Sequence, residues 1–138
     1  MNKIASILLV EDDQLDVIDI RRSLDKLNII YKLTVARNGE EGIAKLEELM
    51  ETDSLPNLVL LDINMPRMNG LEFLAVLRSR EEWKHLSCFI LTTSDEQVDR
   101  NRAKGLNVSG YIVKPFKINQ FTSIDAFNLM IDLMNMKG

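Results

Sequence analysis

Four short apolar runs, each followed by a polar residue, constrain the fold of this 138-residue chain more than any other feature. The runs and the residues that follow them are Ile7–Val10 before Glu11, Leu58–Leu61 before Asp62, Phe89–Leu91 before Thr92, and Tyr111–Val113 before Lys114. Runs of this length, rich in leucine and β-branched residues, are typical of strands buried on both faces of a parallel sheet. Such sheets bind ligands outside the carboxyl ends of their strands. The sequence therefore predicts a polar site at one edge of a parallel sheet.

Expected helices alternate with expected strands along the whole chain. The strands are predicted at 4–10, 30–36, 57–62, 87–92 and 109–113, and the helices at 14–27, 39–51, 70–80, 95–104 and 118–136. Asn38-Gly39 and Asn69-Gly70 mark turns directly before two helices, and Gly105 lies where the end of a helix favours a left-handed residue. Five strand–helix units indicate the α/β class, with helices on both faces of the sheet. No interdomain linker is evident, so we expect one domain over residues 1–138.

Charge and composition argue against several classes of protein. The net charge is −4 and the sequence pI is about 5.0, without the basic cluster that nucleic-acid binding requires. No apolar run is long enough to cross a bilayer, and the N-terminus lacks the features of a signal peptide. The single cysteine, Cys88, falls in an expected strand and is interpreted as a buried structural thiol. We expect a cytoplasmic protein that binds neither nucleic acid nor membrane.

An acidic group is expected where the first and third strands end. If these strands are neighbours, Glu11, Asp12 and Asp62 converge, and their mutual repulsion favours either protonation or a bound cation. Carboxylate oxygens suit Mg²⁺ better than zinc. A solvated acidic rim is the alternative interpretation. For Asp13 and Asp16 we prefer that alternative, because both begin a helix and favour its positive N-terminus.

A lysine and a threonine complete a possible phosphoryl-binding set. The apolar residues before Lys114 favour an inward-pointing side chain, and Pro115 after it allows a cis bond that would turn the chain. Thr92 offers a hydroxyl donor at the same edge, although a strand-end threonine is also common as a β-former. Asp62 would be the nucleophile that forms an aspartyl phosphate. Phosphoryl transfer depends mostly on positioning and charge neutralisation, which these groups supply.

As a set, these motifs resemble the receiver domain of two-component response regulators. The resemblance rests on Glu11-Asp12, the run Asp62–Gly70, Thr92 and Lys114-Pro115-Phe116, and it extends over nearly the whole chain. It implies a flavodoxin-like (βα)5 fold with strand order 2-1-3-4-5. It also implies that Asp62 accepts a phosphoryl group from a sensor histidine kinase or a phosphotransfer protein, and that the chain is a signalling module rather than an enzyme.

The same resemblance assigns roles to individual residues. It implies a Mg²⁺ ion, replaceable by Mn²⁺ or Ca²⁺, bound by Asp12, Asp62 and the backbone carbonyl of Asn64. Glu11 would act on the ion through water. Thr92 and Lys114, the other two members of the set, would hold the phosphoryl oxygens.

A switch is implied at Tyr111, whose ring would turn inward when Thr92 moves towards the phosphate. The surface formed by residues 95–104, 109–113 and 118–136 would then bind a downstream protein target or a second copy of the chain. An ordinary half-exposed strand aromatic is the alternative interpretation of Tyr111. The single-domain layout and the loop at 51–57 are similar to the small regulators that serve phytochrome-type sensor kinases.

Two residues depart from the usual receiver pattern. Glu11 stands where aspartate is commoner, and its longer side chain should still reach a metal-bound water. Thr93 follows the switch threonine where alanine or glycine is usual. Because the extra bulk narrows the entrance, we predict slow phosphorylation by small donors such as acetyl phosphate.

Three other interpretations compete with the stand-alone module. A haloacid-dehalogenase-type phosphatase also uses an aspartate nucleophile and Mg²⁺, but it needs an acid two positions later, where this chain has Asn64. A flavin carrier needs a hydroxyl-rich phosphate loop after the first strand, and Glu11–Asp13 would repel a phosphate there. A receiver excised from a larger protein is the third, although the initial Met1 favours a complete chain.

Overall fold

The computed structural model describes residues 4–27, 29–63, 65, 68–93, 105–114 and 124–135. The expected helix at 95–104, the expected metal ligand Asn64, and Pro115 lie outside these residues, as does the beginning of the helix expected at 118–136. Among the helices that are described, none combines the length and the apolar character that crossing a membrane requires.

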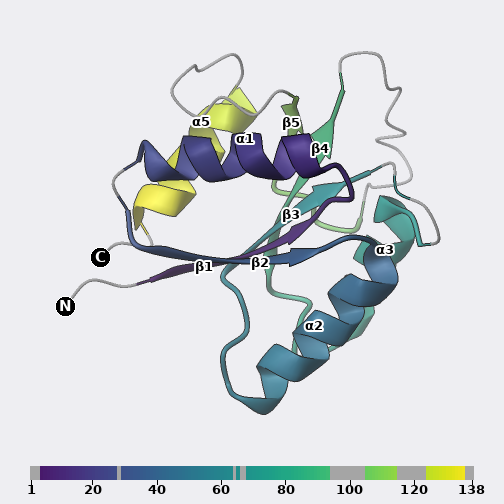
Figure 1. Ribbon diagram of the computed structural model, residues 1–138. Helices are drawn as coiled ribbons and strands as arrows, with labels where there is room; N and C mark the ends of the chain where they lie inside the picture. The colour runs from purple at the N-terminus through teal and green to yellow at the C-terminus, as the bar shows by residue number, and fades with distance from the viewer. Residues whose placement is uncertain are drawn as a thin grey trace.

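Five parallel strands form one sheet in the order β2-β1-β3-β4-β5 (Figure 1). They are β1 (Ala5–Val10), β2 (Tyr31–Ala36), β3 (Leu58–Asp62), β4 (Ser87–Thr92) and β5 (Gly110–Val113). Each begins at the predicted residue or one residue later and ends where predicted. The α/β class and the flavodoxin-like strand order are therefore confirmed.

Two helices cover each face of this sheet in the described part of the chain. Helices α1 (Gln14–Asp25) and α5 (Ile124–Asn135) lie on one face, and α2 (Gly39–Glu51) and α3 (Gly70–Ser79) lie on the other (Figure 1). Helix α1 ends two residues before the predicted Leu27, whose N–H instead forms a tight turn with the Leu24 carbonyl at 3.1 Å. The order of strands and helices is otherwise as expected from the alternation in the sequence.

The sheet separates two hydrophobic cores. On the α1–α5 side, strand residues such as Leu9, Leu60 and Leu91 pack with buried leucines of the two helices. On the α2–α3 side, the alternate strand residues pack with Phe73 of α3 and the fully buried Trp83. Since both faces are covered, the central strands are apolar at nearly every position, which is why their runs are continuous in the sequence. Their carboxyl ends are left as the place for polar chemistry.

Asparagine and aspartate side chains begin the helices that follow three of the strand ends. Asp13 caps α1 by accepting from the N–H groups of Leu15 and Asp16 at 2.8 and 3.3 Å. Asn38 caps α2 in the same way, and Asn69 forms a capping box with Glu72. These caps fix the loops along the edge of the sheet where the polar residues were predicted.

Candidate functional site

Backbone hydrogen bonds between neighbouring strands continue for one residue beyond the ends of β1 and β5, and they hold Glu11 and Lys114. The Glu11 N–H donates to the Ala36 carbonyl at 2.8 Å, and the Lys114 N–H donates to the Thr92 carbonyl at 2.7 Å. Asp62 is itself the last residue of β3 and pairs in register with Leu91. The polar groups of β1, β3 and β5 are therefore held by the same ladder that forms the sheet.

The predicted acidic group is present. Glu11, Asp12 and Asp62 each offer one carboxylate oxygen, and these oxygens lie within 4.8 Å of one another. Glu11 is 1% exposed and Asp62 is 3% exposed, whereas Asp12 is open to solvent. Convergence of the three carboxylates is confirmed because β1 and β3 are neighbours. Two of the three are buried, which the alternative of a solvated rim does not explain.

Lys114 lies between the carboxylates of three different elements. Its Nζ atom is 2.6 Å from Glu11 Oε1, 2.8 Å from Asp16 Oδ2 and 3.5 Å from Asp62 Oδ1. The Lys114 side chain is 12% exposed, so the inward orientation predicted from the sequence is confirmed. The interpretation of Asp16 as a solvated residue at a helix terminus is wrong, because it contacts Lys114 directly. Asp13 does act at the helix terminus, as the N-cap of α1.

Burial controls the protonation of these groups. The pKa of Glu11 is raised to about 8, mainly because the carboxyl is buried; the nearby Asp62 also raises this pKa, and the contact with Lys114 opposes both effects. For Lys114, burial would lower the pKa, but the contacts with Asp16 and Glu11 outweigh burial and raise it above its ordinary value. The lysine is therefore a permanent cation at neutral pH, and Glu11 is the group whose charge depends on what binds nearby.

Thr92 and Tyr111 lie on the opposite face of the sheet from this ion cluster. Thr92 is two residues after Ile90 in β4, and Ile90 pairs with Tyr111 in β5, so all three side chains share one face. That face packs against α2 and α3. The buried Thr92 hydroxyl donates to the Thr93 carbonyl at 3.3 Å, and the half-buried Tyr111 donates its N–H to Asp125 Oδ2 at 2.9 Å. Register thus brings the two proposed switch residues into diagonal proximity.

Gly70 fixes the chain behind Asp62. A Cβ atom at this position would lie 2.7 Å from the Ile63 Cα and 2.8 Å from the Asp62 carbonyl oxygen, closer than such atoms approach. The Gly70 N–H also donates to the Ile63 carbonyl at 3.1 Å. The start of α3 is thereby packed directly on the backbone of the strand end that carries Asp62. The sequence marked Gly70 only as part of a turn.

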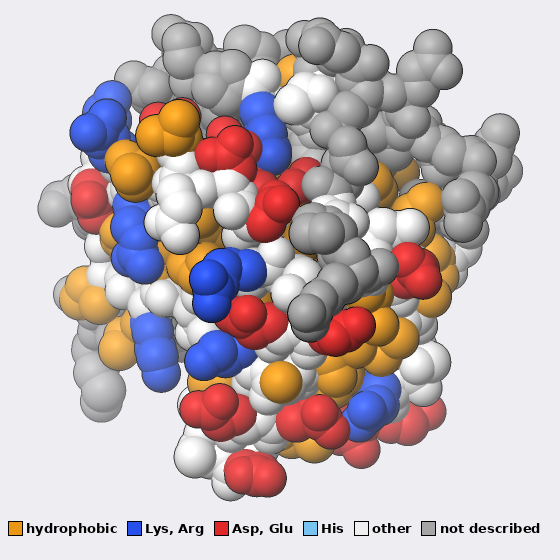
Figure 2. All heavy atoms as spheres, turned by 45° about the vertical axis from the view of Figure 1, so that its right-hand side comes forward, with side chains coloured by type: hydrophobic (Ala, Val, Ile, Leu, Met, Phe, Trp, Pro, Cys, Tyr) orange, Lys and Arg blue, Asp and Glu red, His pale blue; other side chains and the backbone are white. Residues whose placement is uncertain are grey.

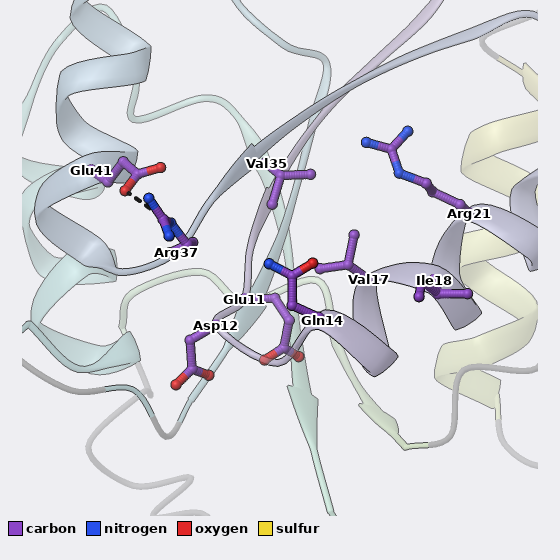
Figure 3. A pocket seen from close by; sticks show the side chains of 9 residues that line it. All are labelled: Glu11, Asp12, Gln14, Val17, Ile18, Arg21, Val35, Arg37 and Glu41. Atoms are coloured by element: carbon purple, nitrogen blue, oxygen red, sulfur yellow. Dashed lines mark ion pairs between the residues drawn. The ribbon is translucent and has the colours of Figure 1, made fainter.

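A groove of about 370 Å³ lies beside the acidic cluster. Figure 3 shows Glu11 and Asp12 near its lower end, α1 along one side with Val17, Ile18 and Arg21, and Arg37 directed towards Glu41 on the other side. The Arg37 Nε atom is 3.9 Å from Glu41 Oε2. Figure 2 shows basic and acidic side chains interspersed over one face of the molecule, with hydrophobic side chains between them. The exposed Asp12 is thus reached from solvent along a groove of mixed charge.

Comparison with known proteins decides the family. A family model of the response regulator receiver domain matches residues 7–124. The chain belongs to the response regulator receiver family. It is therefore a receiver domain of a two-component system, as the motifs in the sequence predicted.

Relatives of this receiver include short regulators and longer proteins. Response regulator Rcp1 of Synechocystis sp. is 34% identical over 110 residues, which are 78% of this chain and 75% of Rcp1. Chemotaxis protein CheY-3 of Vibrio cholerae is 32% identical over 116 residues, which are 84% of this chain and 85% of CheY-3. Sensor histidine kinase CheAY of Helicobacter pylori is 33% identical over 118 residues, which are 86% of this chain but only 14% of CheAY. The receiver thus matches most of some relatives and a small part of others.

Solved structures agree with the family. The Mn²⁺-bound form of response regulator Rcp1 superimposes with a TM-score of 0.72 at 30% identity, covering 96% of this chain and 92% of that one. The bacteriophytochrome response regulator AtBRR superimposes with a TM-score of 0.78 at 30% identity, covering 96% and 94%. Regulators associated with phytochromes are therefore among the structures that this receiver resembles.

Proposed function

We propose that this receiver accepts a phosphoryl group on Asp62 from a phosphohistidine of a sensor kinase or phosphotransfer protein. The observation that carries the proposal is the position of the Asp62 carboxylate, which is buried between the oxygens of Glu11 and Asp12 and the ammonium of Lys114. In the reaction, an Asp62 oxygen forms a bond to phosphorus while the bond from phosphorus to the donor histidine nitrogen breaks. The electron pair of that bond returns to the imidazole.

The residues present fit a divalent metal ion. Asp12 and Asp62 would hold Mg²⁺ directly and Glu11 through water, with the Asn64 carbonyl as the expected third protein ligand. The cation would neutralise the negative charge that develops on the transferred phosphoryl group. Hard carboxylate oxygens suit Mg²⁺. The similar structure of Rcp1 is a Mn²⁺-bound form. Metal binding would also favour the charged form of Glu11, whose pKa burial otherwise raises.

Lys114 and Thr92 would bind the phosphoryl oxygens that the cation leaves free. Lys114 already carries a positive charge within 3.5 Å of the Asp62 carboxylate. Phosphorylation adds about −1.5 to −2 charge, which would draw the Thr92 hydroxyl away from its long contact with the Thr93 carbonyl. Tyr111 would move into the space that Thr92 leaves. This movement would change the surface around β5 that a downstream protein target or a second copy of the chain recognises.

The kinase partner would be located in the cytoplasm, and the bacteriophytochrome response regulator AtBRR suggests a phytochrome-type sensor. We infer that the receiver acts by binding its target, or by passing the phosphoryl group along a relay. It would not turn over substrate as an enzyme, and it would not contact nucleic acid directly.

Intact-mass spectrometry tests the proposed function. The wild type would be incubated with Mg²⁺ and a phosphohistidine donor or a small donor, beside Asp62→Asn and the control Asp53→Asn. We expect one added phosphoryl group in the wild type and in the control, and none in Asp62→Asn. Incorporation should also fail after removal of divalent cations by a chelator. Turnover of phosphate esters without any phosphorylated protein would instead support a phosphatase.

Thr93 provides a second test of the site. It is half-buried beside Thr92, and we propose that its side chain narrows the access of small donors to Asp62. We predict that Thr93→Ala accelerates phosphorylation by acetyl phosphate, measured by mass spectrometry over time. Phosphotransfer from a protein donor should change less, since that reaction depends on docking of the whole partner. Equal rates for Thr93→Ala and wild type with acetyl phosphate would contradict the steric explanation.

A further inference from the structure

Asp16 contacts the site but has no role in the function proposed above. Its Oδ2 atom lies 2.8 Å from Lys114 Nζ, although 98 positions separate the two residues in the chain. The two side chains are 24% and 12% exposed, so the contact is largely shielded from water. In the described part of the chain, Lys114 has three carboxylates within 4.0 Å, and Asp16 is the one that lies outside the acidic cluster.

The backbone at Asp16 is held independently of Lys114. Asp13 Oδ1 accepts the Leu15 and Asp16 N–H groups at 2.8 and 3.3 Å, which fixes the first turn of α1. The Asp13 N–H in turn donates to Glu11 Oε2 at 3.3 Å. The start of α1 therefore contacts the Glu11 carboxylate and fixes the backbone from which the Asp16 side chain reaches Lys114.

Donor geometry indicates what this acceptor does. An ammonium group has three N–H donors. Lys114 donates one of them to Asp16 Oδ2 at 2.8 Å, whereas its 2.6 Å contact with Glu11 Oε1 is an ion pair without hydrogen-bond geometry, and Asp62 lies further away at 3.5 Å. A remaining donor can therefore face the carboxylate that we propose is phosphorylated. A lysine reaches its site on a flexible four-carbon stem and needs such anchors to stay in one place.

We infer that Asp16 is a positioning residue for Lys114, and this inference rests on the proposed function. Asp16 holds the ammonium on the α1 side of Asp62 and keeps one N–H free for a phosphoryl oxygen. When a divalent cation is bound and attracts the Glu11 carboxylate, Asp16 is the carboxylate that still anchors the lysine. The first turn of α1 thereby becomes part of the phosphoryl-binding machinery without contacting the phosphoryl group.

Phosphorylation rates of matched variants test this inference. The rate of incorporation would be measured at saturating Mg²⁺, with saturation established for each protein by titration calorimetry. We expect Asp16→Ala to slow incorporation by about tenfold, the size expected for loss of a charge-assisted hydrogen bond. Asp16→Asn should fall between Asp16→Ala and the wild type, because its amide oxygen can still accept. Asp19→Ala, which removes an acidic residue from the same helix, should behave as wild type.

A second background separates positioning from a general structural effect. In Lys114→Met, Asp16→Ala should cause no further loss, because its effect acts through the lysine. The same loss in both backgrounds, or a wild-type rate for Asp16→Ala, would overturn the inference while leaving phosphorylation of Asp62 intact. A wild type that accepts no phosphoryl group at all would overturn the proposed function and this inference together.

Discussion

The two faces of the sheet hold their polar groups in different ways at the carboxyl edge. On the α1 side, the buried carboxyl groups of Glu11 and Asp62 lie 2.6 and 3.5 Å from the largely shielded ammonium of Lys114. On the α2–α3 side, Thr92 and Tyr111 are neutral, with a 3.3 Å hydroxyl contact and a half-buried ring. Moving a buried charge away from its partner costs several kcal/mol, on the order of 3–5, whereas a neutral side chain rearranges for much less. We therefore expect the charged side to keep its arrangement on phosphorylation and the neutral side to be the one that rearranges.

Removal of Lys114 should have the largest effect on stability. Lys114→Met leaves the surrounding carboxylates without their cation, and we expect a loss of about 3 kcal/mol in the free energy of unfolding in the presence of a chelator. Mg²⁺ should restore part of this loss, since it neutralises the same carboxylates. Urea unfolding with and without Mg²⁺ measures both values.

Lys84→Met is the matched control for that experiment. Lys84 pairs with Glu81 at 2.9 Å, but both side chains are mostly exposed, at 53% and 82%. An exposed pair contributes less than about 1 kcal/mol. Equal losses for the two lysine variants would show that the charges on the α1 side are not held more firmly than those at the surface.

A smaller loss is expected from Gly70→Ala. The added methyl group would meet the backbone of Asp62 and Ile63, which cannot move without shifting the end of β3. We expect a loss of about 1–3 kcal/mol in stability and slower phosphorylation of Asp62. Gly39→Ala at the start of α2 is the comparison, because the three atoms nearest to its methyl group would belong to the Met68 side chain and not to backbone. Equal stability of the two variants would contradict a special role for the approach of α3 to β3.

The stability of the protein should depend on pH through the charged face of the sheet and not through the neutral face. Burial raises the pKa of Glu11 from 4.5 to about 8, so between these values the folded protein binds a proton that the unfolded chain has released. The free energy of unfolding of the metal-free protein should therefore fall as pH rises through this window and level off above it. Urea unfolding in chelator at several pH values measures the slope.

Substitutions on each face identify the source of that slope. Glu11→Gln should flatten it, because the amide does not titrate. Thr92→Val should leave it unchanged, since the neutral face contributes no charge. A slope that survives in Glu11→Gln would assign the titration to another group and rule out the buried Glu11 carboxyl as its cause.

Much of the fold could be predicted because the strands are buried on both faces. Continuous apolar runs located four of the five strands to within one residue, and Gly105 adopts the predicted left-handed conformation with φ of +89°. Cys88 is fully buried, and burial raises the pKa of its thiol to about 12, as expected of a structural cysteine. The runs did not specify which strands are neighbours, since that depends on tertiary packing, and the order came from the family resemblance. Uniformly apolar strands also gave no sign of which residues face which pair of helices.

The site was predictable where a side chain directly ends a buried strand, and not elsewhere. Glu11, Asp62 and Lys114 could be found because strand ends meet at one edge. Asp16 could not, since an aspartate in the first turn of a helix is already explained by the helix dipole. Only the folded structure, which brings the first turn of α1 next to the residue that follows β5, shows that the Asp16 side chain reaches Lys114. The close packing at Gly70 was missed for a similar reason. It depends on the position of the Asp62 and Ile63 backbone, which the sequence around Gly70 does not show.

The smallest expected effect concerns Asp125, which connects α5 to the neutral face. It accepts the Tyr111 N–H at 2.9 Å, and among the strands that the structure describes β5 lies at the edge of the sheet, next to β4 alone. Asp125→Ala should cost about 1 kcal/mol in stability and accelerate amide exchange at Tyr111, measured by NMR. Phosphorylation of Asp62 should proceed at the wild-type rate. Although α5 lies on the α1 side of the sheet, the Asp125 carboxylate accepts from the Tyr111 backbone and not from Lys114. Asn128→Ala, an exposed change in the same helix, serves as the control. If Asp125→Ala slowed phosphorylation as Lys114→Met does, the two faces would be parts of one rigid site and the proposed division between them would fail.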